Sequence, residues 1–111
     1  MKMPNAERAV VELIKLTDYC LNPRHPRGRH KARVFAARTG ITADDAELLR
    51  EALLEAARTS QDAVPGEKDG FGRRYVLDFD LTGPKATATA RSTWIVQANE
   101  DYPRLATCYL L

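Results

Sequence analysis

The sequence has few cysteines and no long hydrophobic run. Cys20 and Cys108 are its only cysteines, and neither lies in a CxxC motif. Two cysteines at this spacing do not indicate a disulfide scaffold, so we expect both thiols to be reduced and buried. No apolar run approaches the roughly 20 residues of a membrane span, and the N-terminus lacks the apolar core of a signal peptide. These absences favour a cytoplasmic protein with no membrane partner.

The sequence also lacks acidic residues over a long internal stretch. No carboxylate occurs between Asp18 and Asp44, whereas residues 19–43 carry six Lys and Arg residues. The net charge of the whole chain is only +2, so the positive charge is concentrated in this stretch. Such segregation indicates a local binding surface for a negatively charged partner. The length of 111 residues predicts one domain, residues 1–111.

Hydrophobic periodicity predicts a helical part over about residues 9–60. Pro23 ends the first helix, Gly40 stops the second, and Thr42 is a good N-cap for the third. The β-branched residues 9–11 are a candidate short strand. The predicted helices cover residues 13–21, 29–38 and 42–60, and the glycine-rich segment 61–72 is expected to be a mobile loop.

From residue 73 the hydrophobic period changes from 3.6 to 2, which predicts an antiparallel meander over residues 73–111. Trp94 is expected in the core, and strict alternation places Leu105, Thr107 and Tyr109 on one face of the last strand. The expected fold class is therefore α+β, with N-terminal helices packed on one face of a three- or four-stranded antiparallel sheet.

The basic stretch contains a turn that runs into a helix, within residues 21–35. Gly28 allows the backbone to approach a ligand closely, and the helix that follows presents free N–H groups to an anion. Arg27, Arg29 and Arg33 add positive charge that suits phosphate or RNA binding. The alternative is a solvated basic face in which proline and glycine only shape the turn.

His25 and His30 belong to the same turn and helix, and histidine exchanges protons near neutral pH. Each histidine is either a ligand contact or a structural hydrogen-bonding group. Two histidines with no nearby cysteine or glutamate do not make a metal site, so we expect no metal and no cofactor. Asp78 and Asp80 share one strand face and could bind Mg²⁺, but exposure to solvent is the favoured interpretation, with pairing to Arg91 or Arg74 as a further alternative.

The predicted sheet carries its own polar residues. Arg91 and Thr93 share a strand face, and a polar patch facing the basic helix would form a cleft for a nucleic-acid backbone. The alternative is that the threonines serve only the β-propensity of the strand.

The residues resemble a bacterial domain family of uncharacterised function. The resemblance is carried by LNPxHPxGxxKAxxF at residues 21–35, LTGP at 81–84, RSxWIV at 91–96 and PRLxTCY at 103–109. Such domains look like toxins of polymorphic-toxin and toxin–antitoxin systems. Their layout is similar to the barnase/EndoU/colicin/RelE class of metal-independent ribonucleases, although no barnase-type Glu/His pair is present.

The resemblance and the basic turn together suggest a metal-independent endoribonuclease toxin that acts on RNA. A small cognate antitoxin or immunity protein, expected to be acidic, would be its partner. The alternative is a non-catalytic module that binds nucleic acid or an acidic protein through the basic face. The candidate catalytic residues are those able to move protons, stabilise a phosphorane or position a phosphate, namely His25, His30, Lys31, Arg91, Thr93 and Tyr109.

Overall fold

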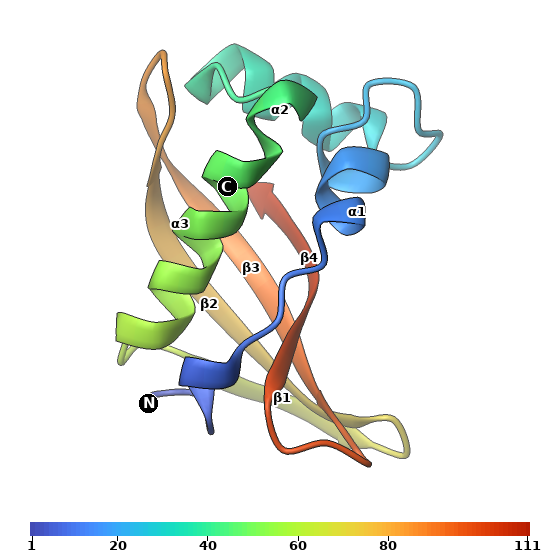
Figure 1. The fold of residues 1–111 in the computed structure, drawn as a ribbon, viewed down its shortest axis with the longest axis vertical. Coiled ribbons are helices and arrows are strands. Elements are labelled where there is room, and N and C mark those ends of the chain that lie inside the picture. The colour runs from blue at the N-terminus through green and yellow to red at the C-terminus, as the bar shows by residue number, and fades with distance from the viewer.

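The computed structural model describes residues 1–111, with all helices preceding the strands. Three helices pack against a four-stranded antiparallel sheet with the strand order β1-β2-β3-β4, which confirms the predicted α+β class (Figure 1). The elements are the 3-10 helix η1 (Ala6–Arg8), α1 (Leu13–Lys15) with its π-helical continuation η2 (Leu16–Cys20), α2 (Arg29–Thr39), the 3-10 helix η3 (Ala43–Asp45), α3 (Ala46–Thr59), β1 (Val64–Asp69), β2 (Gly72–Thr82), β3 (Thr87–Gln97) and β4 (Pro103–Leu110).

Helix α2 ends, and the next helical segment begins, where the sequence predicts. Gly40 has a φ of 78°, a left-handed conformation that favours glycine, and its N–H donates to the carbonyl of Ala36. Thr42 forms a capping box with Asp45 at the start of η3, which leads directly into α3. These local signals set the end of α2 and the start of the next helical segment.

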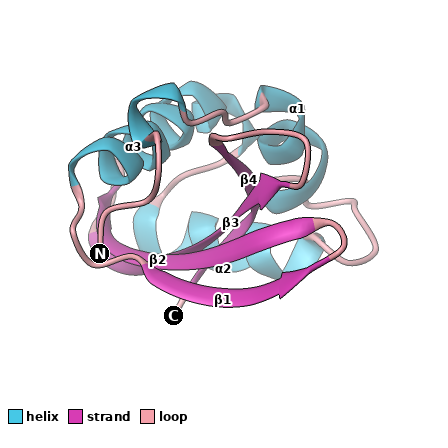
Figure 2. Cartoon of the chain, turned by 90° about the horizontal axis from the view of Figure 1, so that it is seen from below, coloured by secondary structure: helices cyan, strands magenta, loops and turns pink.

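The core lies between the helices and one face of the sheet. In Figure 2, α1 and α3 lie on the same side of the strands. Ala90, Ser92 and Trp94 of β3 are fully buried on that face, and Leu77 of β2 lies opposite Ser92. The alternating residues Arg91 and Thr93 belong to the other face and are half-buried. The prediction that Trp94 is a core residue is confirmed.

Strand β1 corrects the prediction of a loop over residues 61–72. Val64–Asp69 pairs antiparallel with β2 and supplies the fourth strand. All six residues are exposed, and the register is irregular between Pro65 and Lys68. Proline and glycine inside an edge strand without a buried face give no alternating pattern, so periodicity could not reveal it. Residues 9–11 do not form the extra strand, because Val10 makes only an isolated bridge.

Strand β4 contains an irregularity that strict alternation does not predict. Leu105 lies opposite Trp94 in the core, whereas Thr107 lies opposite Thr93 and Tyr109 lies opposite Arg91. The register shifts between these pairs, as in a β-bulge with one extra residue. The expectation that Leu105 shares a face with Thr107 and Tyr109 is therefore wrong. After the bulge, Thr107 and Tyr109 lie on the face directed away from the core, whereas Cys108 is buried in the core.

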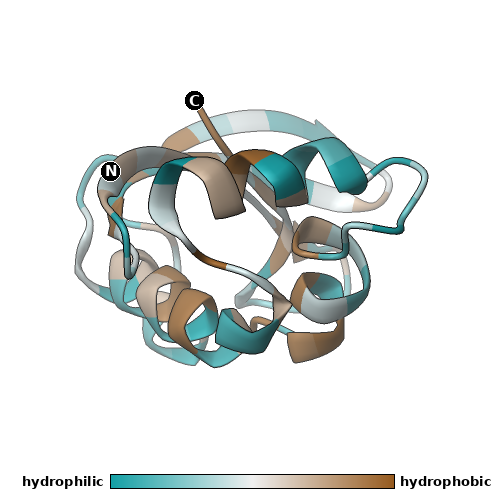
Figure 3. Ribbon diagram, turned by 90° about the horizontal axis from the view of Figure 1, so that it is seen from above, coloured by the Kyte–Doolittle hydropathy of each residue, from teal (hydrophilic) through white to brown (hydrophobic).

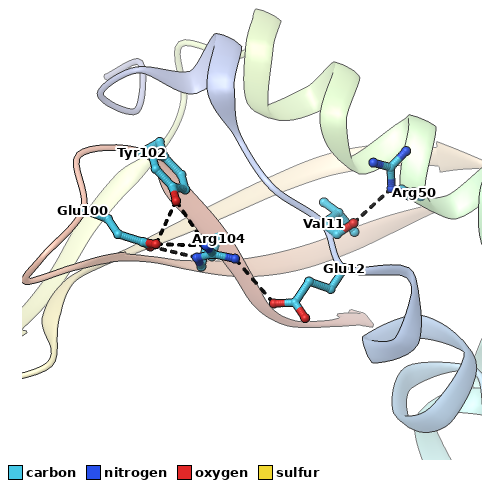
Figure 4. Close-up of polar contacts among 6 residues, drawn as sticks. All are labelled: Val11, Glu12, Arg50, Glu100, Tyr102 and Arg104. Carbon is cyan, nitrogen blue, oxygen red and sulfur yellow. Dashed lines mark hydrogen bonds and ion pairs between the residues drawn. The ribbon is translucent and has the colours of Figure 1, made fainter.

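Two arginines hold the extended segment before α1 between α3 and β4 (Figure 4). The Nε of Arg50 donates to the carbonyl of Val11 at 3.0 Å. Arg104 donates to Glu100 at 2.7 and 2.9 Å, and its third nitrogen lies 3.5 Å from Glu12. These contacts fix the position of α1 and η2, from which one part of the candidate site comes.

Hydrophobic and hydrophilic residues alternate along the helices, as expected for helices with one buried face (Figure 3). The longest helix, α3, has 14 residues. No helix has the length and hydrophobicity of a membrane-crossing segment.

Candidate functional site

The turn before α2 is held against η2 by close packing and by a histidine. A Cβ atom at Gly28 would lie 2.1 Å from the carbonyl oxygen of Tyr19, so only glycine fits there. His25 Nδ1 accepts the backbone N–H groups of Arg27 and Gly28, each at 3.0 Å. The His25 ring meets the Tyr19 ring edge-on at 4.8 Å between centroids. His25 therefore orders the turn through Nδ1, which leaves Nε2 as the nitrogen able to exchange a proton with a substrate.

Lys31 connects the helical part to the edge strand of the sheet. Its Nζ donates to the hydroxyl of Tyr19 at 2.9 Å and to the hydroxyl of Thr107 at 3.2 Å. The same nitrogen lies 4.6 Å from the ring centroid of Tyr19 and 5.6 Å from that of Tyr109. None of the six ion pairs in the structure involves Lys31. Its hydrogen-bond partners are neutral hydroxyls, its ammonium group lies near two aromatic rings, and no carboxylate pairs with it.

Two cysteines lie beneath this contact. Cys20 Sγ is 3.8 Å from the hydroxyl of Thr107, and both Cys20 and Cys108 are buried and free, as predicted. A hydrogen bond with Cys108, assisted by Thr107 and the charge of Lys31, lowers the pKa of Cys20 to about 6. The hydrogen bond with Cys20 and burial raise the pKa of Cys108.

An open cavity of about 270 Å³ lies beside Lys31. It is lined by His30, Lys31 and Val34 of α2 and by Tyr109 and Leu110 of β4. Three of the predicted catalytic residues therefore meet at one place, where the start of α2 faces the end of β4. A histidine, an ammonium group and a phenol around one cavity can move protons and bind an anionic group.

Arg91 lies next to this cluster, but it is already paired. Its Nε and Nη2 donate to the two carboxylate oxygens of Asp78, each at 2.8 Å. This pairing lowers the pKa of Asp78 and raises the pKa of Arg91, to which Tyr109 adds a smaller hydrogen-bonding effect. Asp78 is therefore paired with Arg91, which was the alternative to the favoured expectation of a solvent-facing carboxylate. The structure contains no group of three or more His, Cys, Asp or Glu side chains that could hold a metal ion.

The expected cleft between the basic helix and the polar sheet face does not form. Arg91 and Thr93 lie on the face directed away from the core, whereas α2 packs beside the core face. The two regions meet instead around the edge strand, because Tyr109 lies opposite Arg91 and also borders the cavity with Lys31. The bulge in β4 makes this contact around the edge possible.

Comparison with known families assigns the chain. A family model described as "Domain of unknown function (DUF6883)" matches residues 2–111. The chain belongs to the DUF6883 family. The DUF6883 domain is also similar to a chain of a contact-dependent growth inhibition toxin–immunity protein complex from Klebsiella pneumoniae 342. That match has a TM-score of 0.73 and 19% sequence identity and covers 95% of each chain, which shows a shared fold. No curated protein sequence matches the chain.

The other basic residues of the DUF6883 domain do not join the Lys31 cavity. Arg27 is exposed in the turn, and Arg29 and Arg33 line a second groove on the other flank of α2. Gly28 is buried at the start of the helix, where it packs against η2 and not against open space. The four predicted phosphate-binding residues therefore do not form one site: Arg27 lies in the turn, Gly28 serves packing, and Arg29 and Arg33 belong to the second groove.

Sequence reasoning missed two residues that shape the site of the DUF6883 domain. Tyr19 packs against the core with its ring, and its hydroxyl accepts a hydrogen bond from Lys31. For Thr107 the sequence predicts only a position on the last strand, whereas in the structure its hydroxyl contacts both Lys31 and Cys20. No local signal identifies either residue, because both contacts join segments far apart in the sequence. The LNPxHPxGxxKAxxF pattern indicates Lys31 but not its partners.

Proposed function

We propose that this domain is a metal-independent endoribonuclease and acts as the toxin of a toxin–immunity system. The observation that carries the proposal is the position of Lys31, whose ammonium group pairs with no carboxylate and lies between η2 and β4 beside a cavity lined by His30 and Tyr109. The surrounding residues 19–43 carry no carboxylate, which favours a polyanionic substrate such as RNA. The fold shared with a chain of a growth inhibition toxin–immunity complex supports membership of such a system.

The proposed reaction is transfer of the RNA phosphoryl group to the neighbouring 2′-oxygen. A base takes the 2′-OH proton, the 2′-oxygen attacks phosphorus, and the P–O5′ bond breaks as an acid protonates the leaving 5′-oxygen. His30, which borders the cavity, and His25, through Nε2, are the base and acid candidates. Lys31 stabilises the charge that develops on the non-bridging oxygens of the phosphorane.

The sheet residues position the substrate in this proposal. Tyr109 borders the cavity and offers its phenol to a phosphate oxygen, while Thr93 lies opposite Thr107 on the adjacent strand. Arg91 is neutralised in part by Asp78, so its role is to orient Tyr109 and to add a weaker positive field. Arg27 and the other exposed arginines of the basic stretch, residues 19–43, attract the phosphates of the RNA backbone.

The partner proposed for the toxin is a small acidic immunity protein that covers the basic surface in the cytoplasm. A negatively charged cover would neutralise Lys31 and close the cavity, which would stop both RNA binding and catalysis. Growth arrest on expression, relieved by the Lys31→Met substitution, is the cellular result that this proposal requires.

The direct test is incubation of the purified protein with RNA in EDTA, beside the variants His25→Ala, His30→Ala and Lys31→Met. We expect the wild-type protein to cut RNA and to leave 2′,3′-cyclic phosphate ends, and Lys31→Met to be strongly impaired. Absence of cutting, or equal cutting by all variants, would refute the proposal. Salt-sensitive RNA binding without turnover would instead support the non-catalytic binding module.

A further inference from the structure

A second groove lies on the flank of α2 opposite the Lys31 cavity. It measures about 310 Å³, the lower end of the range for small-ligand sites. Arg29, Arg33 and Ala36 follow one another at helical spacing and form one wall. The remaining lining comes from Ala32 of α2, from the turn between η2 and α2 (Leu21 and Pro23) and from the start of η3 with the residue before it (Thr42, Ala43 and Asp44).

The groove combines a largely apolar floor with two free positive charges. Leu21 and Ala32 are buried beneath it, whereas Arg29 and Arg33 are exposed at its rim. Neither arginine takes part in any of the six ion pairs of the structure. An apolar floor beneath planar guanidinium groups suits a flat, uncharged ring that belongs to an anionic molecule.

Asp44 decides which part of such a molecule the groove holds. Asp44 borders the groove, its side chain is exposed, and no ion pair involves its carboxylate. A carboxylate repels a phosphate but accepts hydrogen bonds from the amino group of a nucleobase. The base would therefore lie in the groove, with its phosphates near the arginines at the rim.

We propose that this groove binds one nucleobase of the RNA strand whose phosphodiester bond is cut at the Lys31 cavity. This inference rests on the proposed function. The two places flank a helix that is about 10 Å across with its side chains, so a strand, and not a single nucleotide, is needed to occupy both. A base that carries an exocyclic amino group, such as cytosine, is preferred over uracil, because uracil presents a carbonyl oxygen at that position and this oxygen would face the carboxylate of Asp44 without a proton between them.

The test uses a fluorescent 2′-O-methyl RNA heptamer, which cannot be cut through its 2′-oxygen. Single abasic positions are introduced along the heptamer, and binding to the full chain is followed by fluorescence anisotropy at fixed salt. We expect one abasic position to weaken binding about tenfold while the number of phosphates is unchanged. Cytosine at that position should bind more tightly than uracil, and Asp44→Asn should remove this difference.

The Ala36→Trp variant fills the groove without changing the charge, at an exposed position. It should weaken binding of the intact heptamer about tenfold and abolish the abasic effect. Arg24→Gln removes one exposed charge from the same basic segment outside the groove and should keep the abasic effect. Wild-type binding by Ala36→Trp, or equal affinity for every abasic heptamer, would overturn the inference.

Two further outcomes separate this inference from the proposed nuclease. Cutting of unmodified RNA that is unaffected by Ala36→Trp would leave the nuclease standing and overturn the base-binding groove. Base-dependent binding of the heptamer without any cutting of RNA would support the groove and refute the nuclease. A poly-glutamate peptide that competes at the groove as well as the heptamer would identify an acidic-protein site and also overturn the inference.

Discussion

The substitution Lys31→Met tests the candidate site with the least disturbance to the fold. Methionine keeps the length of the side chain but removes the ammonium group, with its hydrogen bonds to Tyr19 at 2.9 Å and to Thr107 at 3.2 Å. Both hydroxyls belong to half-buried residues, so water can replace the lost donor. The expected loss of folding stability is about 1 kcal/mol, which corresponds to a fall in Tm of roughly 4–8 °C.

The effect of the same substitution on catalysis should be much larger. Removal of one group that stabilises transition-state charge typically lowers kcat about 10²- to 10³-fold, or about 2.7–4 kcal/mol. The assay is initial-rate cleavage of RNA in EDTA, well below the Tm of each protein. Lys68→Met on the exposed strand β1 is the matched control and should cut at the wild-type rate. A rate loss below tenfold, or an equal loss in the control, would refute the role of Lys31.

Three further predictions concern the framework of the site. Gly28→Ala should destabilise the fold by about 1–3 kcal/mol, because the added Cβ would lie 2.1 Å from the carbonyl oxygen of Tyr19; urea unfolding measures this loss. Ser92→Ala should cost about 1–3 kcal/mol in the same assay, because the buried Trp94 Nε1 loses its acceptor at 2.8 Å. Hydrogen bonding to an arginine lowers the pKa of Glu100 from 4.5, so Tm should fall as the pH drops below 4.5, where the unfolded state binds more protons.

Each of these predictions has a control within the chain. Gly70→Ala should be neutral, because an added Cβ there meets no atom within 4 Å. Thr82→Ala removes an exposed hydroxyl of the same sheet and should cost less than Ser92→Ala. Arg104→Gln should weaken the acid dependence of Tm, since Arg104 is the main cause of the lowered pKa of Glu100. An unchanged acid dependence in Arg104→Gln would contradict the assignment.

The parts of the fold predicted from the sequence are those set by neighbouring residues. Gly40 ends α2 through a left-handed backbone, and Thr42 caps the following helix through Asp45. The alternation through Trp94 likewise identifies the core face of β3. These signals act within one or two helical turns or along one strand, so periodicity and capping rules reveal them.

The parts that were missed depend on long-range contacts or on irregular strands. Strand β1 has no buried face, so nothing in its composition distinguishes it from a loop. The bulge in β4 sends Leu105 and Thr107 to different environments, which strict alternation does not allow. Tyr19 and Thr107 contact Lys31 across 12 and 76 residues of sequence, so only the tertiary fold brings these groups together. The basic segment was therefore located from sequence, whereas the groups that complete the site were not.

The most direct measurement is a double-mutant cycle between the two sides of the cavity, with Lys31→Met from α2 and Tyr109→Phe from β4. The readout is kcat/KM for RNA cleavage in EDTA, with Tm recorded for each protein. If the two residues act on one phosphate, the double variant should be about as slow as the slower single variant, because groups that act as a unit are not additive. Fully additive losses, or cleavage that neither substitution slows, would contradict a single catalytic site formed where α2 meets β4.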